Sequence, residues 1–238
     1  MNGSLNEIHP SAVVAQDVRM GRGNVIGPNA VLFGPLTLGD ENWIGPGVVL
    51  GTPPEVRGVE HTAQWARPSD GPGVRIGSRN VIREYATVHA GWQDDTVIGD
   101  DCFIMNKVYV AHDCRVHDGA TLASSVTLGG HVVIGARANL GMSAVVHQRR
   151  LVGPGAMVGM GAVVTRDVPP WAKAYGNPAR VRGGNVVGME RVGTAAEDAA
   201  TIDRSYRDAE RALPPAPADV PDALAESFDW WRSVAHER

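Results

Sequence analysis

A histidine and an aspartate stand side by side at positions 112 and 113, in the segment VAHDC. Imidazole titrates close to neutrality, so it can accept a proton from an attacking hydroxyl or amine. An adjacent carboxylate can orient the ring and stabilise its charged form. The pair therefore predicts a general base, His112, with Asp113 as its orienter.

Other polar residues recur at a constant interval after this pair. Gly130 and His131 stand one interval beyond it, and Gln148, next to His147, stands one interval further. A single surface histidine is common, but three histidines on one ridge favour a site. A glycine N–H there could stabilise an oxyanion. These groups suit direct acyl transfer from a thioester to a hydroxyl or amine, without a serine or cysteine nucleophile.

This interval is three times a period of six that runs through most of the chain. Aliphatic residues step by six from Ile8 to Leu50, return at Ile76, and continue after a slip of four residues from Ile98 to Val164. This period fits neither an amphipathic helix nor a long alternating strand. It fits short strands and turns wound into a parallel β-helix, with aliphatic side chains inside and glycine frequent at the corners. The sequence therefore predicts an all-β fold in which residues three periods apart stack at about 4.8 Å.

Two stretches interrupt the repeat. Residues 51–73 form a Pro/Gly-rich loop, and residues 94–97 form a small insertion. Loops extruded from a regular scaffold often carry function. From residue 194 the composition changes to two segments with helical spacing on either side of the linker PPAPADVP. We expect a β-helix domain over 1–193 and a helical tail over 194–238, which either caps the open end or contributes to substrate binding.

Composition and charge narrow the function classes. A net charge of −4 gives no indication of binding to nucleic acid or to a membrane surface. The sequence shows neither a leader peptide nor an apolar run long enough for membrane insertion. Its two cysteines, Cys102 and Cys114, do not make a disulfide framework, and both fall at positions expected in the core. These features predict a soluble, reducing, cytoplasmic setting.

The hexapeptide pattern resembles that of the left-handed parallel β-helix acyltransferases. The segments GSRNVIRE, AHDC, LGGHVVIG, GMSAVVHQ, RDVPPW, GNPA and GGNVVGMERVG are similar to one branch, the acyl-carrier-protein-dependent UDP-N-acetylglucosamine O-acyltransferases that begin lipid A synthesis. The likeness covers roughly residues 8–193. It implies a left-handed β-helix of hexapeptide repeats with a short helical C-terminal tail, and a homotrimer with active sites between subunits.

The resemblance also implies substrates and residue roles. The co-substrate would be an acyl thioester of 4′-phosphopantetheine, carried by acyl carrier protein or coenzyme A, with no bound cofactor and no metal. His112 would be the base, Asp113 its orienter and the Gly130 N–H the oxyanion donor. The residues implied in binding the acceptor or the pantetheine arm are Glu55, Arg57, Tyr109, His131, His147, Gln148, Asn185 and Arg191.

Three positions depart from the family pattern. Tyr109 stands where the family has a second histidine, Arg57 where it has a lysine, and Val192 where it has another arginine. Arginine and lysine are not equivalent at a tight site. The catalytic groups are retained and the acceptor-binding groups have changed. We therefore expect an acyltransferase acting on a hydroxyl or amine of a nucleotide sugar such as UDP-N-acetylglucosamine.

One position in this family limits the length of the acyl chain. The matching residue here is Met160, with Met142 one coil away. Two bulky thioethers at this place predict a short- or medium-chain acyl donor. Alternatively, both methionines fill a gap in the trimer interface.

Three other functions compete with this interpretation. A coenzyme A-dependent acetyl- or succinyltransferase would act on a different amino sugar or amino acid, and a structural β-helix scaffold would need no polar ridge. A γ-class carbonic anhydrase would bind zinc through His89, His112 and His117, but the register places His89 and His117 on different edges. The basic residues able to hold the phosphates of coenzyme A or an acidic carrier protein are Arg149, Arg150, Arg166, Arg180 and Arg182.

Overall fold

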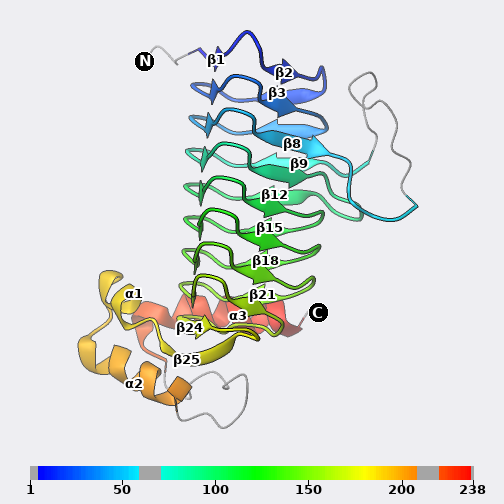
Figure 1. The fold of residues 1–238 in the computed structure, drawn as a ribbon. Coiled ribbons are helices and arrows are strands. Elements are labelled where there is room, and N and C mark those ends of the chain that lie inside the picture. Colours follow the sequence, from blue (N-terminus) through cyan, green and yellow to red (C-terminus); the bar gives the residue numbers. More distant parts are fainter. Residues whose placement is uncertain (1–4, 59–70, 208–219, 237–238) are drawn as a thin grey trace.

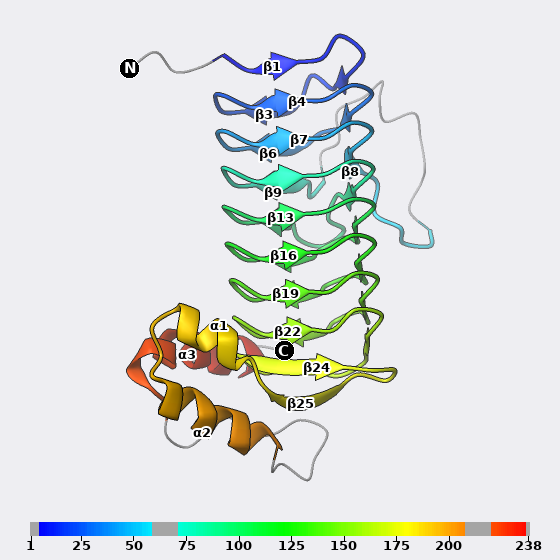
Figure 2. The same cartoon turned by 60° about the vertical axis from the view of Figure 1, so that its left-hand side comes forward.

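The computed structural model describes residues 5–58, 71–207 and 220–236. Most of this length winds into a column of stacked coils, with the first strands at one end and the helices at the other (Figure 1). Each coil contributes one strand to each of three sheets, so up to β23 the neighbouring strands within a sheet are three strands apart in the sequence (Figure 2).

The three sheets contain ten, eight and seven strands. The ten-stranded sheet contains β1 (Glu7–Ile8), β4 (Val25–Ile26), β7 (Trp43–Ile44), β10 (Val81–Ile82), β13 (Phe103–Ile104), β16 (Thr121–Leu122), β19 (Asn139–Leu140), β22 (Met157–Val158), β24 (Ala172–Tyr175) and β25 (Arg180–Gly184). The eight-stranded sheet contains β2 (Val13–Val14), β5 (Val31–Leu32), β8 (Val49–Thr52), β11 (Thr87–His89), β14 (Tyr109–Val110), β17 (Thr127–Leu128), β20 (Val145–Val146) and β23 (Val163–Val164). The seven-stranded sheet contains β3 (Val18–Met20), β6 (Leu36–Leu38), β9 (Val74–Ile76), β12 (Thr96–Ile98), β15 (Arg115–Val116), β18 (Val133–Ile134) and β21 (Leu151–Val152).

The aliphatic residues of the six-residue period form the core. Val110, Leu128 and Val146 are paired in register on successive coils, and each is at most 1% exposed. Burying such a side chain stabilises the fold by about 1.5–3 kcal/mol relative to leaving it in water. Cys102 and Cys114 are buried free thiols, as expected.

The two interruptions of the repeat lengthen single coils. Leu50 pairs with Val88, because the extruded loop after β8 is added to the coil that joins them. Residues 59–70 of that loop lie outside the described part. The small insertion before β12 lengthens the next coil in the same way, so that Ile76 pairs with Ile98.

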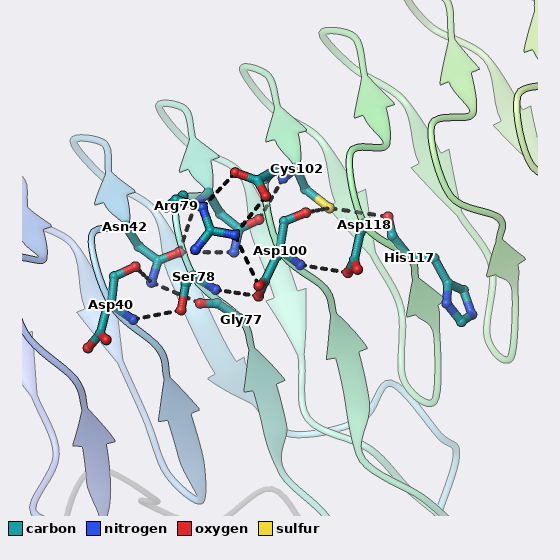
Figure 3. A network of polar contacts seen from close by, with 11 residues as sticks. Asp40, Asn42, Gly77, Ser78, Arg79, Asp100, Cys102, His117 and Asp118 are labelled. Carbon is teal, nitrogen blue, oxygen red and sulfur yellow. Dashed lines mark hydrogen bonds and ion pairs between the residues drawn. The ribbon is translucent and has the colours of Figure 1, made fainter. Parts of the chain in front are cut away.

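Buried asparagines satisfy backbone groups along one corner of the first coils, and Figure 3 shows one of them, Asn42. Asn24, Asn42 and Asn80 are at most 1% exposed. Each side-chain oxygen accepts the N–H of the next member of the row, at 2.9, 3.0 and 2.7 Å, and the row ends at Cys102. The Asn42 amide also donates to the Gly77 carbonyl at 2.9 Å. Since buried polar groups require partners, this row holds successive coils in one register.

Replacing Asn42 by alanine is expected to lower the free energy of unfolding by about 1–3 kcal/mol, because the buried N–H of Asn80 loses its acceptor. Urea denaturation followed by circular dichroism measures the change. The matched control is Asn139→Ala at an exposed position of β19, where we expect a change within about 0.5 kcal/mol. Equal losses in both variants would contradict a specific role for the row.

A hairpin and helices close the C-terminal end. Strand β24 pairs parallel to β22, and β25 folds back antiparallel on it. The helices are α1 (Val186–Arg191), α2 (Ala196–Arg207) and α3 (Ala225–His236), with a short 3-10 helix at Asp222–Leu224. Helix α2 lies beside β25, where the Tyr206 hydroxyl donates to the Pro170 carbonyl at 2.6 Å and the Gly184 N–H donates to Asp203 at 2.7 Å.

The predicted fold class, a parallel β-helix of hexapeptide repeats with a short helical C-terminal tail, is confirmed. The first helix was not predicted, and it begins at Val186. Residues 208–219, which hold the end of the first predicted helical segment and most of the linker, lie outside the described part. Among the described residues, no helix is long and apolar enough to cross a membrane. The division into 1–193 and 194–238 stays a proposal.

Candidate active site

The polar ridge lies at the corner where the chain passes from the eight-stranded to the seven-stranded sheet. His112, Gly130 and Gln148 each occupy the first turn position after β14, β17 and β20. The next residues, Asp113 and His131, have φ near 59°, the left-handed conformation that makes a sharp corner. The His131 N–H donates to the His112 carbonyl at 3.0 Å, so the two coils are directly joined at this point.

The structure brings His112 and Asp113 into direct contact. The His112 Nδ1 and the Asp113 Oδ2 are 2.5 Å apart. A carboxylate accepts, so Nδ1 carries the proton and Nε2 of a neutral ring is left with a free lone pair. The Asp113 side chain is 2% exposed and that of His112 is 15% exposed. This arrangement fixes the tautomer that a general base requires.

The turn between β11 and β12, which the four-residue insertion enlarges, holds Asp113 in place. Its backbone N–H groups at Trp92, Gln93 and Asp94 all donate to the Asp113 Oδ1, at 3.2, 2.8 and 2.7 Å. The Asp113 N–H donates to the buried Thr96 hydroxyl at 2.9 Å. Sequence reasoning missed these residues. The signal was the slip of four residues one coil before Asp113, because an enlarged turn there must lie against the ridge.

Burial of Asp113 opposes ionisation, but hydrogen bonds outweigh it. Donation from the backbone N–H of Asp94, from His112 and from the N–H of Gln93 stabilises the carboxylate, and the nearby His131 adds to the effect. The net result is a pKa below the ordinary carboxyl value. Asp113 is therefore charged at neutral pH and can stabilise a protonated His112.

Gly130 lies directly beneath the imidazole of His112. A Cβ atom at this position would be 2.6 Å from both Cε1 and Nε2 of the ring. Only glycine allows the ring to lie this close. Among the described residues, none accepts a hydrogen bond from the Gly130 N–H, whereas the N–H groups of its neighbours Gly129 and His131 are both paired.

His131 completes the cluster. Its ring is perpendicular to that of His112 at a centroid distance of 5.2 Å, and its Nε2 is 3.6 Å from the Asp113 Oδ2. Burial lowers the pKa of His131, Asp113 opposes this shift, and Arg149 and His112 reinforce it. We therefore expect a neutral ring near pH 7.

His112, Asp113 and His131 are also the described residues that could hold a metal ion, since their ligand atoms lie within 4.8 Å of one another. Their existing bonds fit an acid–base role better. One carboxylate oxygen accepts three N–H groups, and the other faces Nδ1 of His112. A metal on Nδ1 would have to displace that contact. A metal-free site stays a prediction.

The positions of His89 and His117 argue against the zinc site of a γ-class carbonic anhydrase. His89 ends β11 in the eight-stranded sheet, whereas His117 follows β15 in the seven-stranded sheet. His89 bonds the start of the extruded loop through the Pro53 carbonyl at 2.8 Å. His117 packs edge-on against Trp230 of α3, at a centroid distance of 5.1 Å.

Glu55 and Tyr109 both contact His89. The Glu55 Oε1 is 3.3 Å from the His89 Nε2, and the Tyr109 ring lies 5.2 Å from the His89 ring. Arg57, two residues after Glu55, is exposed. The base of the extruded loop is thus fixed on the face of the eight-stranded sheet that also carries Tyr109.

The other expected site residues are more distant from His112 within one chain. His147 and Gln148 are exposed and lie two coils along the ridge. Asn185 caps the start of α1, accepting the Gly188 N–H at 3.2 Å and donating to the Gly155 carbonyl at 2.9 Å. Arg191 is exposed in the last turn of α1.

Met142 and Met160 lie on a different corner from His112. They occupy the turns after β19 and β22, where the chain passes from the ten-stranded to the eight-stranded sheet. Their side chains are exposed, Met142 by 51% and Met160 by 72%. A single chain therefore does not bring the proposed chain-length residues to the His112 ridge.

Two protein families match parts of the chain. The family described as bacterial transferase hexapeptide (six repeats) matches residues 95–130, which include His112 and Gly130. The family described as UDP N-acetylglucosamine O-acyltransferase, domain 2, matches residues 167–218, which include the hairpin, α1 and α2.

Similar proteins carry consistent names. A Burkholderia orbicola acyl-[acyl-carrier-protein]–UDP-N-acetylglucosamine O-acyltransferase is 37% identical over 135 residues, covering 56% of this chain and 52% of that protein. A Ralstonia nicotianae protein of the same name is 53% identical over 139 residues, covering 56% and 51%. The chain thus spans about half the length of the curated relatives it matches.

A solved structure extends the likeness to almost the whole fold. The UDP-N-acetylglucosamine acyltransferase from Campylobacter jejuni superposes with a TM-score of 0.78 at 26% identity, covering 95% of this chain and 90% of that one. The resemblance to the acyl-carrier-protein-dependent UDP-N-acetylglucosamine O-acyltransferases that the sequence indicates is therefore confirmed, from the hexapeptide coils to the helical C-terminal part.

Proposed function

We propose that this protein transfers an acyl group from a phosphopantetheine thioester to a hydroxyl of a nucleotide sugar such as UDP-N-acetylglucosamine, with His112 as general base. One observation carries the proposal. The enlarged turn between β11 and β12 holds Asp113, Asp113 fixes the tautomer of His112, and the free lone pair on Nε2 lies beside Gly130. The relatives' names supply the substrate classes.

The proposed reaction proceeds by direct attack. The Nε2 atom of His112 accepts the proton of the acceptor hydroxyl as its oxygen bonds to the thioester carbonyl carbon. The Gly130 N–H donates to the oxyanion that forms, while Asp113 stabilises the imidazolium. The C–S bond then breaks, and His112 returns the proton to the departing thiolate. The products are an ester of the acceptor and a free phosphopantetheine thiol.

The complete site requires more than one chain. Asn185, Arg191 and Met160 lie away from the His112 ridge, and a second copy in a homotrimer would place such residues opposite it. Exposed apolar side chains at Met142, Val145, Met157 and Met160 favour a covered surface at that corner. We therefore propose a homotrimer in the cytoplasm, with acyl carrier protein as the partner that delivers the acyl group.

Met160 is proposed to limit the acyl chain, which gives a direct test. Met160→Gly is expected to shift the preferred donor to longer chains, raising the ratio of long-chain to short-chain kcat/KM at least about tenfold, since each additional buried methylene contributes about 0.8 kcal/mol. Competition between donors of different length, read by mass spectrometry, measures this ratio. Met160→Leu retains the bulk and serves as the control. An unchanged profile in Met160→Gly would assign the methionines to packing between subunits.

Mass spectrometry of reaction mixtures tests the proposed function itself. Purified protein is mixed with short- to long-chain thioesters of acyl carrier protein and of coenzyme A, and with UDP-N-acetylglucosamine or its amino analogue. We expect His112-dependent acylation of at least one acceptor, with carrier-protein thioesters preferred. Transfer only from coenzyme A to other amino sugars or amino acids would support the coenzyme A-dependent alternative. No transfer from a folded protein would contradict both.

A further inference from the structure

A groove of about 870 Å³ begins at the catalytic cluster and crosses the seven-stranded sheet. Asp113 and His131 lie at one end, and Trp230 and Val234 of α3 form the far wall. The C-terminal segment is anchored by two fully buried side chains, Leu224 of the 3-10 helix and Phe228 of α3. The groove therefore places a surface made by the helical tail opposite the site of the proposed reaction.

Three arginines line this groove, and the ion pairs of two of them are long. Arg115 is 4.0 Å from Asp94, the longest ion pair among the described residues. Arg150 is 3.5 Å from Asp167, whose same oxygen accepts the Leu151 N–H at 2.8 Å. The Arg150 Nε is buried without a partner among the described atoms.

Arg149 has the least acidic surroundings of the three. Its nearest described side-chain contact is the Nε2 of His131, at 3.4 Å, and the described residues provide no carboxylate within 4.0 Å of it. Arg79, outside the groove, shows the contrast: Asp101 and Asp100 hold it at 2.7 and 3.2 Å. Guanidinium groups with unused donors are suited to phosphate oxygens.

The far wall offers an aromatic surface beside these charges. Trp230 packs edge-on against His117 and separates the groove from a smaller pocket of about 220 Å³. Trp171 lines that pocket, and its buried indole N–H has no acceptor among the described atoms. Asp94, Asp113 and Asp167 also line the groove. Guanidinium donors left unused by these carboxylates, next to aromatic rings, suit a ligand that joins a phosphate to a flat heterocycle.

We propose that this groove binds the phosphate ester of a nucleotide-containing substrate, with Arg115, Arg149 and Arg150 contacting the phosphate and Trp230 contacting the heterocycle. The inference rests on the proposed function, because the proposed acceptor and a coenzyme A donor both carry such a group. In UDP-N-acetylglucosamine it is the diphosphate and uracil. In coenzyme A it is the phosphates and adenine, whereas the arm of acyl carrier protein offers a phosphodiester without a heterocycle.

Equilibrium binding distinguishes these sources without requiring turnover. The protein is titrated with UDP, uridine, coenzyme A and pantetheine, with heat or tryptophan fluorescence as the signal. We expect UDP or coenzyme A to bind at least about tenfold more tightly than its phosphate-free counterpart, and less tightly as salt is added. Preference for UDP assigns the groove to the acceptor, and preference for coenzyme A assigns it to the donor.

Variants locate the binding. Arg149→Gln and Arg115→Gln together are expected to weaken binding of the phosphate ligand at least about tenfold. Arg232→Gln is the control, since Arg232 is exposed on α3, pairs with Asp229 and does not line the groove. Trp230→Ala tests the contact with the heterocycle. Trp230→Phe, which keeps an aromatic ring at the wall, replaces it if the alanine variant destabilises α3. The inference is overturned if the phosphate-free compounds bind equally well, or if the double variant binds as the parent does.

The two proposals can fail separately. Phosphate binding that depends on these arginines, without His112-dependent transfer, would support the proposed groove and contradict the proposed acyltransferase activity. Normal acyl transfer by the double variant would support the proposed acyltransferase activity and contradict the proposed role of the groove.

Discussion

Replacing His112 by alanine is expected to lower kcat by about 10²- to 10⁴-fold, the contribution typical of a positioned general base. The side chain is the one group in the described cluster whose free lone pair lies beside Gly130. Its removal leaves the Gly130 N–H and the binding surfaces in place, so KM is expected to change little. Initial rates with a saturating acceptor and varied thioester measure both constants.

The fold is expected to survive this change. His112 projects from a corner, and the core residues Val110 and Leu128 remain packed. Circular dichroism and size-exclusion chromatography should match the parent. The control is His9→Ala, an exposed histidine of the first coils whose side chain bonds only its neighbour Ser11 among the described residues. If His112→Ala retained parental kcat, or His9→Ala lost as much, His112 would not be the base.

The regular part of the molecule could be predicted from the sequence because its contacts repeat. A period of six determines which residues point inward, and three hexapeptides return the chain to the same corner. The stacking of Gly130 on His112 follows from this return alone. Predicting the core positions and the stacked corners requires only the register of the six-residue repeat, and the buried aliphatic residues determine that register.

The support of Asp113 could not be predicted, because it depends on the irregular turn. Three N–H groups from Trp92, Gln93 and Asp94 converge on one oxygen. That convergence is set by backbone dihedrals within the enlarged turn between β11 and β12, and no side-chain pattern encodes them. The sequence indicated only that an extra four residues lie one coil before the ridge.

The path of the tail was also beyond sequence reasoning. Helical spacing predicts α2 and α3, but it does not say which sheet α3 returns to, because the chain between them lies outside the repeat. Asn185 shows a second limit. The resemblance assigns it to the nucleotide-sugar side, and the structure shows it capping α1 and bonding the Gly155 carbonyl. Asn185 could cap α1 and also contact the nucleotide sugar only if that ligand bound at the N-terminus of α1.

Replacing Asp113 by asparagine is expected to lower kcat by about 10³-fold. The amide oxygen would remain with the three N–H donors of the enlarged turn, so its NH₂ group would face Nδ1 of His112. The ring would then adopt the other tautomer, with its proton on Nε2, and could not accept a proton from the acceptor. His112→Ala and Asp113→Asn combined should therefore be no slower than His112→Ala alone, which a four-variant rate comparison measures.

The same substitution is expected to change stability and its dependence on pH. Losing the charge-assisted bond to His112 should lower the free energy of unfolding at pH 7 by about 1–3 kcal/mol. The pKa of Asp113 in the folded protein lies below the ordinary carboxyl value. The unfolded chain therefore binds the proton first as the pH falls, and the stabilisation is lost from about pH 4 down through the folded pKa.

Urea unfolding at several pH values from neutral to acid measures this dependence. The parent should lose stability over that acid range more steeply than Asp113→Asn, in which the titrating group is gone. Asp94→Asn is the matched control, because its side chain is 73% exposed and its backbone N–H still donates to Asp113. If Asp113→Asn kept the parental acid dependence and the parental kcat, the carboxylate would be neither the orienter of His112 nor a source of the stability that the insertion provides.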